Sequence, residues 1–198
     1  GHDSHSRKLT DIIKQKVFIV AISSAASGYV VMSYIMTATP MSMHIIDGFS
    51  LAHTKTVIQS HVIAMFLPSL FTPLIVKWIG LSKMMITGLI LYFICIAIAL
   101  IDHTLVHYWV ALVLLGLGWN FLFIGGTSLL PQSYNDNEKY KVQSINDFLI
   151  FSLQAIASLS AGWLVFNYGW EIVLLSVIPI LVLQLAVLLW WVKHKQNG

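Results

Sequence analysis

The sequence predicts an all-α integral membrane protein, a bundle of six transmembrane helices, on three observations. First, 58% of the 198 residues are hydrophobic and only 10% are charged, whereas a soluble domain carries about 25% charged residues. Second, six apolar segments approach the roughly 20 helical residues that cross the hydrocarbon core. Third, lysines and arginines collect in alternate connections. Because lipid offers no hydrogen bonds to the backbone, these segments are predicted to be helices.

Short turns that are polar or contain proline or glycine separate the predicted helices. The helices span Val17–Thr39, Thr56–Val76, Met84–Ile101, Val106–Leu130, Val142–Phe166 and Ile172–Val192. The turns are Pro40–Lys55, Lys77–Lys83, Asp102–Leu105, Pro131–Lys141 and Asn167–Glu171. The chain thus divides into a polar lead-in (1–16), a transmembrane domain (17–192) and a tail (193–198). The lead-in has no apolar core, so it is interpreted as a linker, and its start at Gly1-His2 indicates processing, a tag remnant or a piece of a larger protein.

The basic residues predict the orientation. One side of the predicted bundle holds all but one of them: Arg7, Lys8, Lys14, Lys16, Lys77, Lys83, Lys139, Lys141, Lys193 and Lys195. Only Lys55 falls on the other side. By the positive-inside rule both termini are cytoplasmic. The net charge of +3 therefore reflects topology, and no nucleic-acid partner is indicated.

The fifth predicted helix carries polar side chains into the membrane on one face. Gln143, Asp147, Gln154 and Ser158 recur at helical spacing, with Asn146 beside them. Such a face must meet other helices, a water-filled cavity or a ligand. Gln143, Asn146 and Gln154 are therefore candidate cavity residues, and an ionisable residue in this place is a candidate functional residue.

Asp147 has two interpretations. About two turns from the predicted cytoplasmic interface, it could couple transport to protons or contact a solute. Alternatively, it is a structural carboxylate that pairs with Lys139 or Lys141 or caps a neighbouring helix.

Asn120 lies close to the middle of the fourth predicted helix, next to Trp119 and one turn from Phe123. An asparagine at this depth with aromatic neighbours suits the binding of a planar or amphipathic solute. It also suits an interhelical hydrogen bond, which is worth only about 1 kcal/mol in a membrane. Asn120 is the first candidate for solute contact.

Three further polar residues are candidates on the first two helices. Tyr34 and Thr37 share a face that could line a cavity or pack against a helix. His61 is a candidate proton carrier, since histidine titrates near neutral pH, and a structural histidine is the alternative. Pro68 and Pro73, deeper in the same helix, predict a kink.

No other recognised chemistry is indicated. His44 and Asp47 could form a metal pair, but no third ligand is close in sequence, and polar loop residues are the alternative. Cys95 is the only cysteine, so an internal disulfide is excluded. No nucleophile–base pair, phosphate-binding loop or zinc motif appears. The sequence therefore predicts no enzyme, no cofactor and no resident metal.

Four segments resemble a known family: residues 36–44 (MTATPMSMH), 119–127 (WNFLFIGGT), 141–148 (KVQSINDF) and Tyr168-Gly169-Trp170. With six helices and both termini inside, the chain from about Leu9 onward resembles the C-terminal half of a bacterial major facilitator superfamily transporter. The turn before Lys83 departs from the family pattern Gly-x-x-x-Asp-Arg-x-Gly-Arg-Lys and keeps only Gly80 and Lys83. The family's Asp-Arg gating contacts are therefore not carried over.

The fold class is accordingly predicted as a six-helix half made of two inverted three-helix repeats. A weak echo supports the repeats: a Gln-Ser dipeptide opens the second helix at Gln59 and the fifth at Gln143. Coincidence is the alternative.

The resemblance implies a secondary transporter of the bacterial inner membrane that moves a small solute by alternating access, driven by a proton gradient. A typical member has twelve helices, so this half needs a second one. That partner is the N-terminal half of the same protein, a separate chain, or another copy. The competing hypothesis is a non-transporting scaffold or assembly partner that keeps the half-transporter fold.

Overall fold

The computed structural model describes residues 5–197, and this part of the chain is all-helical, without a strand. The helices are α1 (Leu9–Ile13), α2 (Lys16–Pro40), η1 (Met41–Ile46), α3 (Leu51–Phe66), η2 (Leu67–Leu70), α4 (Thr72–Ile101), α5 (Leu105–Leu129), η3 (Leu130–Ser133), η4 (Asp136–Glu138), α6 (Lys139–Tyr168), α7 (Trp170–Ser176) and α8 (Ile178–Gln196). The predicted all-α class is confirmed. The outer ends of the predicted lead-in and tail, residues 1–4 and 198, lie outside the described residues.

The second predicted helix, Thr56–Val76, is wrong as a single element. The α3 helix ends at Phe66, the 3-10 turn η2 follows, and α4 begins at Thr72. Pro68 and Pro73 account for the interruption, because proline has no N–H with which to continue the helical ladder. The structure therefore has a break where the two prolines predicted a kink.

The predicted turn at Lys77–Lys83 is narrower than expected. Only Gly80 is non-helical, with φ 84° and ψ 166°, and it separates two helical parts of α4. This positive φ is accessible to glycine without strain. Among the described residues, five helices are long and apolar enough to cross a membrane. The remaining predicted crossing, Thr56–Val76, is divided among α3, η2 and the part of α4 before Gly80.

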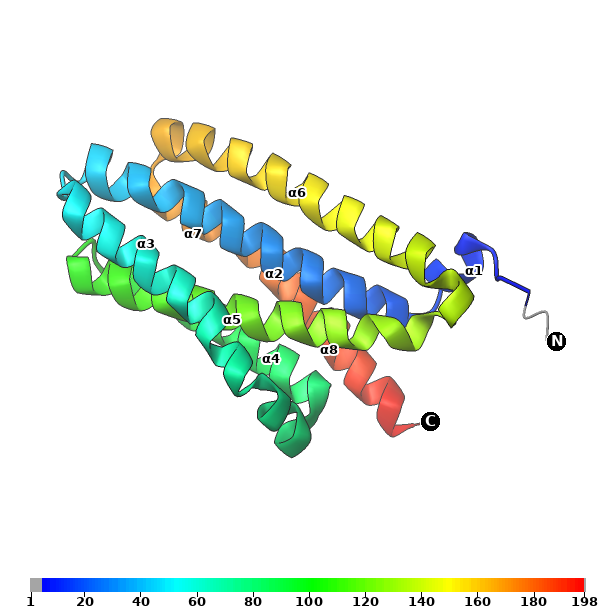
Figure 1. Cartoon of the computed structure of the whole chain (residues 1–198). Helices are drawn as coiled ribbons and strands as arrows, with labels where there is room; N and C mark the ends of the chain where they lie inside the picture. The colour runs from blue at the N-terminus through cyan, green and yellow to red at the C-terminus, as the bar shows by residue number, and fades with distance from the viewer. Residues whose placement is uncertain (1–4, 198) are drawn as a thin grey trace.

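The bundle is built around α2 and α5, which pack on each other. The α3 helix packs on the other side of α5, and α6 packs on α2. The α4 helix packs on α5 and α8, and Figure 1 shows α7 and α8 passing behind α2. The four helices α3, α5, α2 and α6 thus form one layer, which α4, α7 and α8 back.

Small residues let the central helices approach closely. An added Cβ at Gly118 would lie 2.5 Å from the Tyr92 ring, and one at Gly126 would lie 2.6 Å from the Ala21 carbonyl oxygen. The Tyr92 hydroxyl donates to the Gly28 carbonyl at 2.7 Å. The α2, α4 and α5 helices are therefore tightly packed on one another at these glycines.

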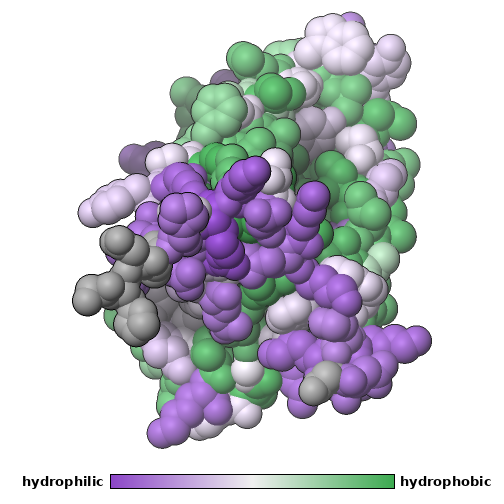
Figure 2. Space-filling view, turned by 90° about the vertical axis from the view of Figure 1, so that its right-hand side faces the viewer, coloured by the Kyte–Doolittle hydropathy of each residue, from purple (hydrophilic) through white to green (hydrophobic). Residues whose placement is uncertain are grey.

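Both ends of the described chain lie at the same end of the bundle, as does the connection from α5 to α6 (Figure 1). Viewed from this end, hydrophilic residues gather over the centre and lower right, with hydrophobic residues around them (Figure 2). This distribution is the one expected of a multi-pass membrane protein that meets water at its ends.

Candidate functional site

The α6 helix presents the least covered surface of the bundle. Of the 18 residues that make up its apolar membrane-crossing stretch, 22% are buried inside the chain, against 56% for the corresponding stretch of α5. Along it, Gln143, Gln154 and Ser158 are half-buried and Asp147 is exposed. The predicted polar face of α6 is therefore only partly covered by the chain's own helices, and Asn146 beside it is buried.

Asp147 accepts a 3.3 Å hydrogen bond from the side chain of Asn146 and forms no ion pair with another described residue. The Lys141 ammonium donates instead to the Ser6 hydroxyl at 2.7 Å and to the Arg7 carbonyl at 2.5 Å. The predicted alternative, in which Lys141 pairs with Asp147, is not formed. Asp147 thus remains available to a proton, an ion or a solute.

Asn120 is fully buried, and its side chain joins α5 to the break after α3. Its Nδ2 donates to the Met65 carbonyl at 2.7 Å and to the Ser69 hydroxyl at 2.9 Å. Its Oδ1 accepts from the Thr72 hydroxyl at 3.1 Å. These bonds favour the predicted interhelical alternative, and contact with a solute stays a prediction.

His61 is also fully buried, between α3 and α5. Its Nδ1 lies 2.8 Å from the Leu112 carbonyl oxygen, so Nδ1 carries the proton, and its Nε2 has no partner among the described residues. A second proton on Nε2 would create a buried unpaired donor, which is costly. This geometry favours the structural alternative for His61, and a role in proton coupling stays a prediction.

Tyr34 and Thr37 are half-buried on α2. The Tyr34 hydroxyl accepts from Ser176 at 3.0 Å and borders a groove of about 280 Å³ between α2, α6 and the α7–α8 segment. On α6, the side-chain amide of Gln143 donates to the Tyr134 hydroxyl at 3.1 Å. Among the described residues, no hydrogen bond joins Asn120 or His61 to the candidates on α6. The candidates therefore form separate groups.

A cluster of aromatic rings lies on the same layer of helices and was recognised only in part from the sequence. Trp119 and Phe123 stack with ring centroids 4.9 Å apart. Tyr29 meets both rings edge-on, and Phe66 meets Trp119 in the same way. Phe151 joins through Tyr29. The sequence identified Trp119 and Phe123 as neighbours of Asn120, but no local pattern connects them to rings on three other helices.

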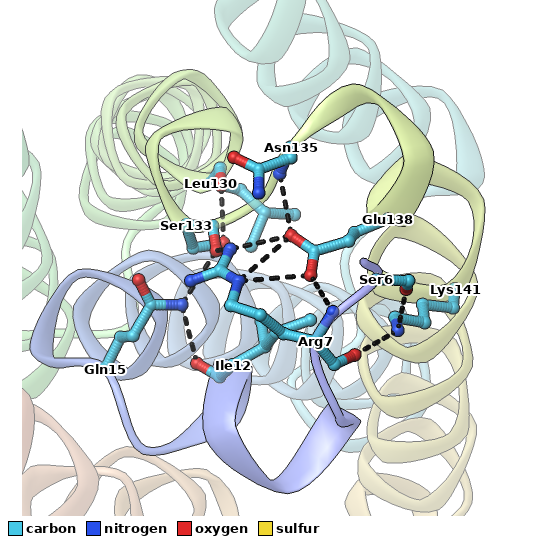
Figure 3. A network of polar contacts seen from close by, with 9 residues as sticks. All are labelled: Ser6, Arg7, Ile12, Gln15, Leu130, Ser133, Asn135, Glu138 and Lys141. Atoms are coloured by element: carbon cyan, nitrogen blue, oxygen red, sulfur yellow. Dashed lines mark hydrogen bonds and ion pairs between the residues drawn. The ribbon is translucent and has the colours of Figure 1, made fainter. Parts of the chain in front are cut away.

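The N-terminal end of α6 is held by a polar network that the sequence did not predict (Figure 3). Glu138 is fully buried, and its carboxylate accepts from the Arg7 guanidinium at 2.7 Å, the Arg7 backbone N–H at 2.8 Å and the Asn135 N–H at 2.9 Å. Arg7 also donates to the Ser133 carbonyl at 3.0 Å. The predicted linker is therefore packed against the start of α6.

The opposite end of the bundle has a second network, centred on His103. Its Nδ1 lies 2.9 Å from Asp47, and its Nε2 is hydrogen-bonded to Glu171. Tyr108 donates to Asp47 at 2.6 Å. Burial lowers the pKa of His103, but the two carboxylate hydrogen bonds outweigh that effect and raise it. His103 thus joins the end of η1 to the start of α7 through two carboxylates, which favour its protonated form.

The predicted pair of His44 and Asp47 does not form around a metal. His44 Nδ1 is hydrogen-bonded to the Phe49 carbonyl at 2.7 Å, and Asp47 faces His103 instead. Within residues 5–197, no group of three or more histidine, cysteine, aspartate or glutamate side chains is placed to hold a metal ion.

Comparison with known proteins adds to this description. Residues 8–198 match the profile of the Major Facilitator Superfamily. The chain is 38% identical over 194 residues to the riboflavin transporter RfnT of Brucella anthropi, covering 98% of this chain and 48% of that protein. Two Bacillus subtilis relatives carry the names of uncharacterized MFS-type transporters: YddS is 32% identical, covering 93% of this chain and 43% of that protein, and YdeG is 34% identical, covering 83% and 39%. No solved structure matches the chain.

Proposed function

The chain belongs to the Major Facilitator Superfamily, and we propose that it is one half of a secondary active transporter that moves a small solute across the membrane by alternating access. The chain spans less than half the length of the curated relatives it matches. A complete transporter of that length would place a second six-helix half opposite this one.

The partly covered polar face of α6, on which Asp147 is exposed and Gln143 and Gln154 are half-buried, is the observation that carries the proposal. A helix with amide and carboxylate side chains facing lipid is costly, so this face calls for a polar cavity or a protein partner. The partner is the N-terminal half of the same protein, a separate chain or a second copy of this one. A cavity between the halves would then include Gln143, Asn146, Asp147 and Gln154, with Tyr34, Thr37 and Asn120 as further candidates.

Proton coupling is assigned to Asp147 in this proposal, with His61 as the second candidate. Asp147 is supported by its exposure and by its freedom from an ion pair with any described residue.

The orientation follows from the basic residues. The proposal places the protein in the inner membrane of a bacterium, with both termini and the Arg7–Glu138 network on the cytoplasmic side, as the positive-inside rule expects. The His103 network then lies on the outer side.

Riboflavin is the first solute to test, because a relative that matches nearly the whole chain is named as its transporter. The test is uptake of riboflavin by bacterial cells that express the complete transporter containing this chain, with and without a proton gradient. We expect gradient-driven uptake above that of cells lacking the protein. If uptake is unaffected by collapse of the gradient, proton coupling is refuted, but transport of riboflavin is not.

Replacement of the coupling residue sharpens this test. We expect Asp147→Asn to abolish gradient-driven uptake while the protein stays folded in the membrane. Asp136→Asn is the matched control, since it removes the same charge from an exposed site before α6 and should leave uptake unchanged. Normal uptake by Asp147→Asn would remove Asp147 from the mechanism. A wild-type protein that moves no solute at all would favour the scaffold hypothesis.

A further inference from the structure

We propose that five aromatic side chains from four helices form a stacking surface for a planar heteroaromatic part of the solute. They are Tyr29 of α2, Phe66 of α3, Trp119 and Phe123 of α5, and Phe151 of α6. This inference rests on the proposed function, since it assigns a class of solute to the same cavity. The five rings are called the aromatic surface below.

The rings form one connected cluster. Trp119 and Phe123 stack on each other, 10° from parallel. Trp119 is buried and forms the floor of the cluster, whereas Tyr29 and Phe123 are half-buried and partly accessible. Tyr29 stands edge-on to both, at 5.4 and 5.3 Å between centroids, and reaches Phe151 at 5.9 Å. Phe66 approaches Trp119 at 5.5 Å. A planar ring added to such a cluster can stack on one face or meet another edge, which are the two favourable geometries of aromatic pairs.

The depth of the aromatic surface suits a transported solute. Tyr29 lies near the middle of Lys16–Pro40, Phe151 near the middle of Lys139–Tyr168, and Trp119 near the middle of the α5 span. Phe66 is the last residue of α3, just before the break. Secondary transporters hold their solutes near the bilayer midplane, between the two halves.

The aromatic surface also lies on the open side of the bundle. The α4 helix packs against Gly118 and Gly125 of α5, through Tyr92 and Met85. Trp119 and Phe123 project from another side of α5. Phe66 and Phe151 are 57% and 54% exposed, so helices of the described chain leave the cluster open at these two rings.

Two variants test the aromatic surface without disturbing the buried core. Phe66→Leu and Phe151→Leu remove exposed rings and keep apolar side chains of similar size. The matched controls are Phe71→Leu and Phe166→Leu, since Phe71 is 58% and Phe166 is 54% exposed and neither makes a ring contact with a described residue. The measurement is the dissociation constant of lumichrome, a planar tricyclic ring without a sugar-alcohol chain, for the purified complete transporter. Ribitol, which has no ring, serves as the competitor.

We expect each surface variant to weaken lumichrome binding roughly threefold to tenfold, in line with the energy of one aromatic pair. The controls should bind as the wild type does, and ribitol should not displace lumichrome. If the surface variants and the controls bind lumichrome with equal affinity, the inference is overturned, whereas the proposal of riboflavin transport is not affected. Ring-dependent lumichrome binding without riboflavin uptake would support the aromatic surface and overturn the proposed solute. A wild-type protein that binds no planar probe would overturn the aromatic surface.

Discussion

The α5 and α6 helices are adjacent in sequence and similar in length, but they are packed in opposite ways. The α5 helix is in contact with α2, α3 and α4 along its length, and glycines on several of its sides permit the close approach. The α6 helix packs mainly on α2, and large hydrophobic side chains such as Leu159 and Phe148 remain exposed on it. One helix is the interior of this half, and the other is a boundary of it.

The difference shows where a partner or a solute can act. Tight packing around α5 leaves little freedom for the side chains there, which explains why Asn120 of α5 and His61 of α3 have their hydrogen bonds within the bundle. The α6 helix is held at its two ends, by the Arg7–Glu138 network before it and by Glu171 after it. Between these ends Asp147 is exposed and Gln154 is half-buried, so this helix can present polar groups to a partner or a cavity.

The largest effect on folding is expected where the two helices carry matched glycines. An added Cβ at Gly116 of α5 would lie 2.5 Å from the backbone oxygen of His61, whereas at Gly162 of α6 the nearest atom is the flexible Met41 methyl at 3.3 Å. We expect Gly116→Ala to destabilise the protein by about 3 kcal/mol through overpacking. Gly162→Ala should be neutral or slightly stabilising. Thermal unfolding in detergent measures both, and equal melting temperatures would refute the difference in packing.

The attachment at the N-terminal end of α6 should contribute a smaller amount to stability. Arg7→Ala leaves the buried Glu138 carboxylate with only the Arg7 and Asn135 backbone donors, and we expect a loss of about 2 kcal/mol in stability. Lys8→Ala is the control, since Lys8 is exposed and makes no side-chain hydrogen bond to a described residue. Chemical unfolding monitored by tryptophan fluorescence measures the loss. A value for Arg7→Ala no larger than for Lys8→Ala would mean that the network does not hold α6.

The attachment at the other end should have the smallest effect and depend on pH. Since the pKa of His103 is raised on folding, its contribution is complete below the unfolded value of 6.5 and is lost as pH rises through the higher folded value. We expect His103→Gln to lower stability by under about 1 kcal/mol at acidic pH and by less at alkaline pH. Melting temperatures between pH 6 and pH 9, with His53→Gln as control, measure this. A difference that does not change with pH would contradict a charged His103.

The sequence predicted the parts of this protein that local patterns determine. Hydropathy identified the membrane segments, and Pro68 and Pro73 predicted a disturbed second helix, although not a break with α4 beginning at Thr72. The spacing of Gln143 and Asp147 predicted one polar face, on which the structure exposes Asp147 and half-buries Gln143; a role in a cavity stays a prediction.

Contacts between distant residues could not be predicted in the same way. Arg7 and Glu138 are 131 positions apart, and each alone is an ordinary charged residue near a helix end. The aromatic surface depends on the rotation of four helices, which hydropathy does not determine. Asn120 was correctly placed deep in its helix, but whether it faces a cavity or α3 depends on how closely α5 packs there.

Solvent access to the middle of α6 tests the central claim most directly. Cys95 is the only cysteine of this chain and is buried. After replacement of any cysteines in the other half, single cysteines can be introduced at Gln154 and, on the opposite face of the helix, at Ile156. The measurement is labelling by a water-soluble maleimide in the complete transporter in membranes. If α6 lines a transport cavity, Gln154→Cys is labelled, Ile156→Cys is not, and solute slows the labelling. If both positions resist labelling or react alike, α6 does not line an aqueous cavity and the account is wrong.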